Sequence, residues 1–188
     1  ELWRRGRNFL PDSGCYVYAG DKEVTAQRNW FRQTQVHNTL TLDDRNLEHT
    51  DSKCVRWTTD GATDILTVEN PSYEGLTHRR TVWFVDREFF VIADEAYGKA
   101  QGEAGLHYNL LECNPAEDIA ACAVATRFDD GNNLLLKVFG AEKMERREGW
   151  VSRTYRNRTE RPAYAFTAHK EPGQTVRFVT VLLPAADA

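Results

Sequence analysis

Short runs of alternating apolar and polar residues, separated by turn signals, extend along most of this chain of 188 residues. Alternation at a period of two is typical of half-buried strands. The turn signals are those that close strands, such as Asp60-Gly61, Asn70-Pro71 and Asp129 to Asn133. We therefore expect strands at residues 15–19, 37–43, 55–59, 64–69, 76–84, 89–93, 105–111, 121–128, 134–139, 150–155, 163–169 and 175–183.

Many short strands with little helical periodicity predict an all-β fold, an antiparallel layered β-sandwich. Only residues 115–125 could hold a helical turn or two. Residues 89–93 are almost continuously apolar, which predicts a strand covered on both faces. No internal repeat, linker or low-complexity segment divides the chain, so we expect residues 1–188 to form a single domain.

The stretch from residue 28 to residue 44 contains the strongest candidate for chemistry. His37 stands at the start of an alternating strand, and an imidazole with a pKa of about 6.5 can act as acid or base near neutrality. Arg28 and Arg32 would supply positive charge to an anionic ligand, and Trp30 and Phe31 would supply flat apolar surface. A lone strand histidine is more often structural, so a hydrogen-bonded His37 in a purely scaffolding domain is the alternative.

The chain has five histidines, and none of them makes an HxH or HExxH pair. A metal site assembled across strands from His78, His107 and Asp94 is one interpretation of their positions. The more frequent situation is that His78 and His107 are sheet residues hydrogen-bonded to their neighbours.

Two basic runs could bind an anionic sugar. Residues 77–80 alternate, so that one of Arg79 and Arg80 faces into the fold and the other faces out. The second run comprises Arg153, Arg156, Arg158 and Arg161, with tyrosines nearby. Guanidinium groups bind carboxylate or sulfate bidentately, and aromatic rings stack on sugar rings. A solvated charged sheet face explains the second run equally well.

Composition narrows the function classes. The formal net charge is -4, from 24 basic and 28 acidic residues, and this disfavours general nucleic-acid binding. No apolar run approaches the roughly 20 residues that a membrane helix needs, so no membrane partner is expected. The four cysteines, Cys15, Cys54, Cys113 and Cys122, form no CxxC pattern, and we expect them to be mostly free and buried. GxSxG and P-loop motifs are absent, whereas a Cys/His dyad stays open.

Two strings, residues 5–16 (RGRNFLPDSGCY) and 30–42 (WFRQTQVHNTLTL), resemble the C-terminal domain of heparinase II/III-type polysaccharide lyases, above all the heparinase III branch. Further matching pieces cover nearly the whole chain: residues 69–73, 77–80, 89–94, 149–152 and 178–184. Lyases that act on alginate and other uronates share the His-Asn-Thr core of the second string.

The resemblance implies a lyase with an N-terminal helical toroid, a C-terminal layered β domain and an active site between them. Such enzymes cleave uronate-containing chains by β-elimination. An asparagine that neutralises the C5 carboxylate and a tyrosine come from the helical domain, which this chain does not contain. The proton-transferring histidine of the β domain maps onto His37. Substrate-binding roles then fall to Arg28, Arg32, Gln33, Asn38, Arg79 and Arg80.

Some relatives have a zinc-site histidine two residues after the catalytic one. Thr39 occupies that position here, which disfavours a divalent metal, and the sequence assigns no cofactor. The chain begins at Glu1 without methionine, so we expect an excised piece or a processed product. The resemblance implies a larger, periplasmic or secreted enzyme, of which this piece should be inactive or nearly so alone because two catalytic partners are missing. The expected partners are an acidic polysaccharide and the missing helical domain. The alternatives are a module that binds acidic glycan without chemistry, and a lyase acting on another uronate polymer.

Overall fold

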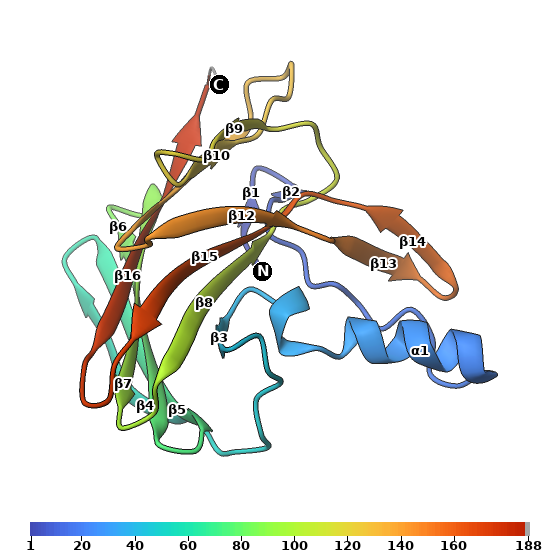
Figure 1. Ribbon diagram of the computed structural model, residues 1–188. Coiled ribbons are helices and arrows are strands. Elements are labelled where there is room, and N and C mark those ends of the chain that lie inside the picture. Colours follow the sequence, from blue (N-terminus) through green and yellow to red (C-terminus); the bar gives the residue numbers. More distant parts are fainter. Residues whose placement is uncertain (187–188) are drawn as a thin grey trace.

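Two antiparallel sheets face each other across one core in the computed structural model, which describes residues 1–186. Figure 1 shows the larger sheet nearly edge-on beside the smaller one. The predicted all-β antiparallel sandwich is therefore confirmed. The larger sheet contains, in spatial order, β4 (Lys53–Asp60), β5 (Thr63–Tyr73), β6 (Leu76–Val85), β7 (Phe89–Gly98), β16 (Val176–Ala185), β11 (Asn133–Phe139), β10 (Ala123–Ala125) and β9 (Ala116–Asp118).

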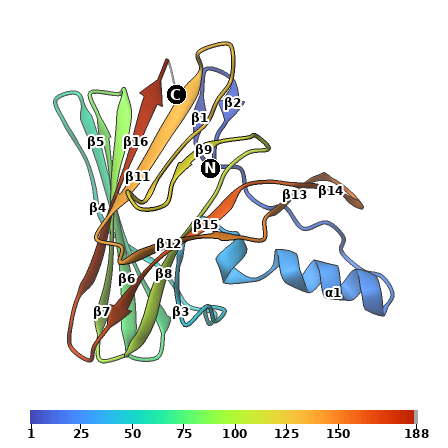
Figure 2. The ribbon, with the colours of Figure 1, turned by 45° about the horizontal axis from the view of Figure 1, so that its top comes forward.

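The smaller sheet has four strands, and its outer side carries the only α-helix of the described residues. Its spatial order is β12 (Lys143–Arg147), β15 (Ala163–Lys170), β8 (Gly102–Asn109) and β3 (Leu40–Leu42). The helix α1 (Lys22–Phe31) and the hairpin of β13 (Trp150–Thr154) and β14 (Asn157–Glu160) lie beyond this sheet, away from the larger one (Figure 2). A second hairpin, β1 (Trp3–Arg4) with β2 (Arg7–Asn8), lies near the N-terminus.

The core is built by the alternation that the sequence displays. Side chains on the facing sides of the two sheets interdigitate, among them Leu106 and Phe166 from the smaller sheet and Leu136 and Phe178 from the larger. All four are fully buried. Tyr108 also points into this layer, and its hydroxyl donates a 3.0 Å hydrogen bond to Thr180 Oγ1 of the opposite sheet. The buried phenol is thus satisfied, as a buried polar group must be.

The helix corrects the expectation that helical turns would occur only at residues 115–125. That segment instead contains the short strands β9 and β10, and the helix lies at Lys22–Phe31. Asp21 caps it, because its side chain accepts a 3.0 Å hydrogen bond from Val24 N. Phe31 is its one buried residue. The helix therefore lacks the apolar stripe by which helices are recognised in a sequence.

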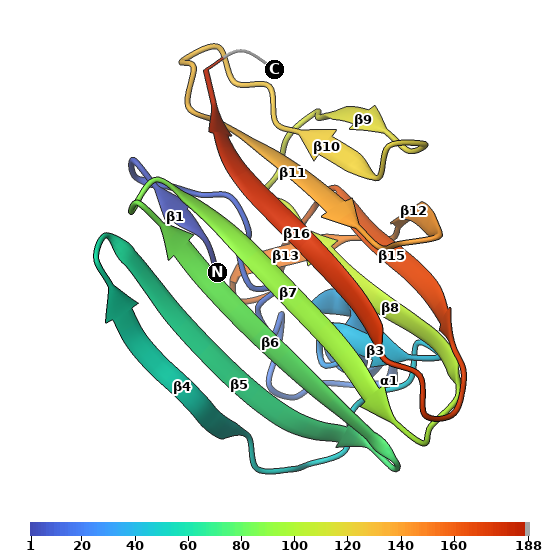
Figure 3. The ribbon, with the colours of Figure 1, turned by 90° about the vertical axis from the view of Figure 1, so that its left-hand side faces the viewer.

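Two further local expectations were wrong. Residues 15–19 form no strand, and the backbone of Tyr16 turns through a positive φ of 59°. Residues 89–93, in β7, are only partly buried, because no other element of the described chain covers the outer face of the larger sheet, which faces the viewer in Figure 3.

The cysteine prediction is half right. All four cysteines are free, as expected, but none is buried: Cys15 and Cys54 are exposed, and Cys113 and Cys122 are partly buried. Within residues 1–186, no helix has the length and apolar character required to cross a membrane.

Replacing Phe178 by alanine should lower the free energy of unfolding by about 3–5 kcal/mol, because the change leaves a cavity between the two sheets. Phe139 on the neighbouring strand β11 is half exposed, and Phe139→Ala should cost less than about 1 kcal/mol. Urea denaturation followed by circular dichroism measures both. Equal losses in the two variants would contradict the core assignment.

Candidate functional site

His37 lies in the irregular segment that joins the helix to the smaller sheet. A 3-10 turn, η1 (Thr34–Val36), precedes it, and the His37 amide donates to Thr34 O at 3.1 Å. The strand predicted for residues 37–43 starts at Leu40, so His37 comes before the ladder instead of within it. Its side chain is 37% exposed. His37 is therefore not buried, as the scaffolding alternative required, although it is hydrogen-bonded.

Asp12 is the closest partner of the imidazole. The Asp12 Oδ2 atom lies 2.8 Å from His37 Nδ1, and Asp12 Oδ1 accepts a 2.8 Å hydrogen bond from Gly14 N. The His37 hydrogen bond, with help from the Gly14 amide and the Arg161 charge, lowers the pKa of Asp12 to about 2 against the effect of partial burial. An ionised carboxylate only accepts hydrogen bonds, so Nδ1 must carry the proton. In the neutral ring Nε2 then has a free lone pair and can act as a base.

A groove of about 580 Å³ opens beside His37. Arg32, just after the end of α1, is exposed and contributes the positive charge among its lining residues. The other side chains are short and mostly polar, and suit hydrogen bonding to hydroxyl groups. The lining residues are Asn29, Arg32, Thr34, His37, Thr39, Asn46 and Leu47.

The remaining predicted residues of this stretch lie near the groove without lining it. Arg28 is half-buried in the last turn of α1, one turn before Arg32. Gln33 is partly buried, and its Oε1 atom accepts a 2.8 Å hydrogen bond from Gln35 Nε2. Both residues remain predictions as substrate contacts.

Asn38 and Arg80 hold the backbone that follows His37. Asn38 Oδ1 accepts from Asn109 N at 2.7 Å, and Arg80 Nη1 donates to Asn38 O at 2.8 Å. Arg80 Nε also donates to the buried Asp94 at 2.7 Å. Burial raises the pKa of Asp94, but the charge of Arg80 and a hydrogen bond from His78 outweigh it and keep the pKa below its usual value. In this structure both predicted binding residues are engaged with the protein.

Arg79 faces away from Arg80, as the alternation predicted. It lies on the outer face of the larger sheet, where it pairs with Glu69 at 2.5 Å. The same face carries Glu95, which pairs with Arg177 at 2.6 Å. The structure therefore does not bring Arg79 together with His37.

The candidate metal residues are separated. His78 Nε2 lies 2.6 Å from Asp94 Oδ1 on the larger sheet, whereas His107 Nε2 lies 2.8 Å from Thr41 Oγ1 on the smaller sheet. Among residues 1–186, no group of three or more histidine, cysteine or acidic side chains is arranged to hold a metal ion. Both histidines are hydrogen-bonded to neighbours, which was the alternative interpretation.

The arginines of the second basic run are partly exposed and partly buried. Arg153 is half exposed and forms a bidentate pair with Glu112, and Arg158 lies 4.1 Å over the Trp150 ring. Arg161, in contrast, is only 5% exposed. The interpretation of this run as a solvated charged face therefore holds for the exposed arginines and is wrong for Arg161.

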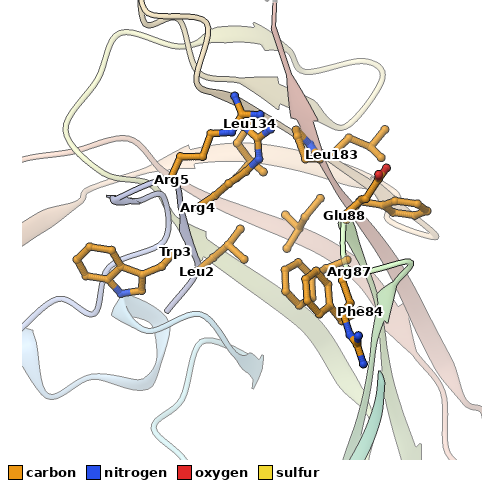
Figure 4. Close-up of a pocket in the computed structure, with 13 residues that line it drawn as sticks. Leu2, Trp3, Arg4, Arg5, Phe84, Arg87, Glu88, Leu134 and Leu183 are labelled. Atoms are coloured by element: carbon orange, nitrogen blue, oxygen red, sulfur yellow. The ribbon is translucent and has the colours of Figure 1, made fainter. Parts of the chain in front are cut away.

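A larger hollow, of about 760 Å³, lies at the other end of the sandwich. Figure 4 shows Leu2 and Trp3 of the N-terminal segment across from Phe84, near the end of β6, and Arg87 of the β6–β7 turn. Its lining is predominantly apolar and contains no histidine. It lacks a group suited to proton transfer near neutral pH, so the groove beside His37 is the better candidate site.

The sequence-based prediction missed Asp12, which carried no assigned role although it lies within the string of residues 5–16. It also missed Asn29 and Asn46, which line the groove from segments that flank His37 on either side in the sequence. Asp12 could have been suspected, since a carboxylate in a turn is a frequent partner of histidine. The asparagines carried no such signal.

Asp12 predicts a difference in stability at low pH. Since its folded pKa is depressed, the pair with His37 stabilises the fold above the unfolded pKa of 3.8, and this contribution is lost as pH falls through about 2. Asp12→Asn should cost about 0.2–1 kcal/mol at pH 5 and almost nothing at pH 2. Urea denaturation at both pH values measures this, with Asp60→Asn as an exposed control. A cost that does not change with pH would contradict the pairing.

Comparison with known proteins agrees with this fold and these motifs. The family model described as heparinase II/III-like, C-terminal, matches residues 1–179. A heparin-sulfate lyase of Bacteroides stercoris is 45% identical over 98% of this chain, and one of Pedobacter heparinus is 41% identical over 98%. A solved heparinase III structure superposes with a TM-score of 0.95 at 45% identity, covering 98% of this chain and 29% of that one.

The resemblance found in residues 5–16 and 30–42 is thereby confirmed. This chain spans 28% of the length of the two curated relatives. By the match over residues 1–179 and by these identities, the chain belongs to the heparinase II/III-like C-terminal domain family.

Proposed function

We propose that this chain is the C-terminal domain of a lyase that cleaves uronate-containing glycosaminoglycan of the heparan sulfate type by β-elimination, with His37 transferring a proton. The observation that carries the proposal is the His37–Asp12 pair at 2.8 Å, which lies beside a groove that also contains Arg32. The names of the relatives, heparin-sulfate lyases, support the substrate class.

In such an elimination a base removes the C5 proton of the uronate, the electron pair forms the C4–C5 double bond, and the C4–O bond breaks. The leaving oxygen then takes up a proton. His37 Nε2 serves one of these two proton transfers, because Asp12 occupies Nδ1. The resemblance implies that a tyrosine serves the other and that an asparagine neutralises the carboxylate. Both would come from the part of the longer protein outside this chain, so this chain alone should be inactive.

Arg32 suits the anionic groups of such a substrate. Among the residues lining the groove it is the one with a permanent positive charge, and it has no ion-pair partner among the described residues. A guanidinium binds sulfate or carboxylate through two parallel hydrogen bonds. The local charge at the groove can therefore favour an acidic chain although the net charge of the domain is -4.

Replacing His37 by alanine in the full-length protein should lower turnover of heparan sulfate by about 10²- to 10⁴-fold, because a general acid–base group is lost. Ultraviolet absorbance of the unsaturated product measures the reaction. His169→Ala is the matched control, since His169 is 59% exposed and pairs with Glu171 on another part of the surface. Retained turnover in His37→Ala would overturn the assignment. Activity that is absent even from the wild type, with glycan binding intact, would instead favour the non-catalytic binding module.

Arg32→Ala should raise KM by about tenfold, which corresponds to the loss of one charge-assisted hydrogen bond of about 1.4 kcal/mol. The kcat should change much less, because the interaction is made equally in the ground state and the transition state. Arg177→Ala, on the outer face of the larger sheet, is the control. An unchanged KM at low ionic strength, where attraction between charges is strongest, would contradict a role of Arg32 in substrate binding.

A further inference from the structure

Arg161 is a buried arginine that no part of the proposed reaction uses. It stands between β14 and β15, and its Nη1 atom donates to Pro11 O at 2.6 Å. Its Nη2 atom donates to Ser13 Oγ at 2.5 Å and approaches Val36 O at 3.4 Å. Pro11 and Ser13 are the two neighbours of Asp12, and Val36 directly precedes His37. One guanidinium therefore joins the two segments that carry the Asp12–His37 pair.

Ser13 completes this connection. It is fully buried, and its hydroxyl accepts from Arg161 and donates to Val36 O. Its backbone carbonyl accepts a 2.8 Å hydrogen bond from Ser152 N of β13. Gly14 comes so close to this strand that a Cβ atom would lie 2.2 Å from Ser152 O, and its φ is +78°. The loop that carries Asp12 is thus bound to a β hairpin far away in the sequence.

The segment after His37 is held independently. Asn38 accepts a hydrogen bond from Asn109 N through its side chain and one from Arg80 through its backbone carbonyl. The backbone on both sides of His37 is therefore fixed by buried or partly buried groups. The ring itself keeps its orientation through Asp12 alone among the described residues.

The charge of Arg161 also acts on Asp12. Burial lowers the pKa of Arg161 to about 10, and the charges of Asp12 and Glu112 oppose this shift. The arginine therefore remains protonated at neutral pH. Its hydrogen bonds go to two carbonyl groups and a hydroxyl, and the carboxylate of Asp12 supplies compensating negative charge without a direct hydrogen bond.

We propose that Asp12 and Arg161 are positioning residues for His37: Asp12 holds the neutral imidazole with its proton on Nδ1 and Nε2 free, and Arg161 fixes the two loops so that this pair forms. The role in catalysis rests on the proposed function, whereas the arrangement of the ring does not. A ring with Nε2 unprotonated can take a proton from the substrate and, once protonated there, can pass that proton on. The opposite tautomer would present an N–H and could not act as a base.

The first test is Asp12→Asn. An amide can donate to Nδ1 as well as accept from it, so the variant should populate the tautomer with the proton on Nε2. The ¹⁵N chemical shifts of the His37 ring at neutral pH report this directly, in the 188-residue chain with labelled histidine. The matched control is Asp130→Asn, because Asp130 is similarly exposed and its carboxylate pairs with Arg7 instead. Unchanged His37 shifts in Asp12→Asn would overturn the proposal.

In the full-length protein, Asp12→Asn should lower kcat by at least about tenfold with KM within about twofold, since the substrate contacts stay and the proton transfer suffers. The Asp130→Asn control should retain both constants. If His37→Ala retains turnover, the proposed function fails, while the ring spectrum still tests the positioning. If His37→Ala abolishes turnover and Asp12→Asn leaves kcat unchanged, the positioning inference fails.

Arg161 is tested through Ser13, because removal of a buried arginine can unfold the domain. Ser13→Ala deletes the hydroxyl between Arg161 and Val36 O and leaves the guanidinium bonded to Pro11 O. We expect kcat to fall by about threefold to tenfold and the His37 ring to populate a mixture of its two tautomers. Arg161→Lys should cause a larger fall, since a single ammonium nitrogen does not reproduce the planar fork that reaches Pro11 O and Ser13 Oγ from two separate nitrogens. Ser72→Ala, which deletes a buried hydroxyl bonded to Asn70 O on the larger sheet, is the control. Wild-type kcat and ring spectra in a folded Arg161→Lys variant would overturn the role of Arg161.

Discussion

The burial of two apolar sheet faces against each other is the constraint on which the rest of this molecule depends. Leu40 and Leu42 of β3 are almost fully buried at the edge of the smaller sheet, where β3 pairs only with β8. The chain just before β3 must therefore emerge from the core at this edge. His37 lies three residues before Leu40. Its position on the surface follows from the packing of the strand that it precedes.

Buried polar groups restrict the loops in a different way. Arg161 and Arg80 are both removed from most solvent, and each donates to a backbone carbonyl next to the His37 segment. A buried cation is tolerated only where hydrogen bonds and opposite charge replace the lost water. These arginines therefore accept few alternative positions for the loops they contact. The conformation of the irregular segments around the groove is therefore fixed in part by these buried arginines, which are costly to leave without hydrogen bonds.

Strand residues and loop residues have different roles in this domain. Residues in the regular strands mainly pack or pair within the protein, as do the Arg79–Glu69 and His78–Asp94 pairs. The groups that face the groove come from the end of α1, from the 3-10 turn and from the loops on either side of β3. Binding and catalytic groups are typically carried on loops that a rigid scaffold positions. The curated relatives are more than three times as long as this chain.

The sequence by itself determined the fold class and most of the strands, because period-two alternation and turn residues are local signals of a half-buried antiparallel sheet. The motif around His37 also identified the family. Helix α1 was not predicted from the sequence, since it buries only Phe31 and shows no periodic apolar stripe. The inward orientation of Arg80 and outward orientation of Arg79 followed from alternation, but their partners did not. Only the tertiary structure decided that Asp12, His37 and Arg161 meet. These residues are 25 and 124 positions apart in sequence, and their contacts arise from the packing of separate elements, which no local pattern encodes.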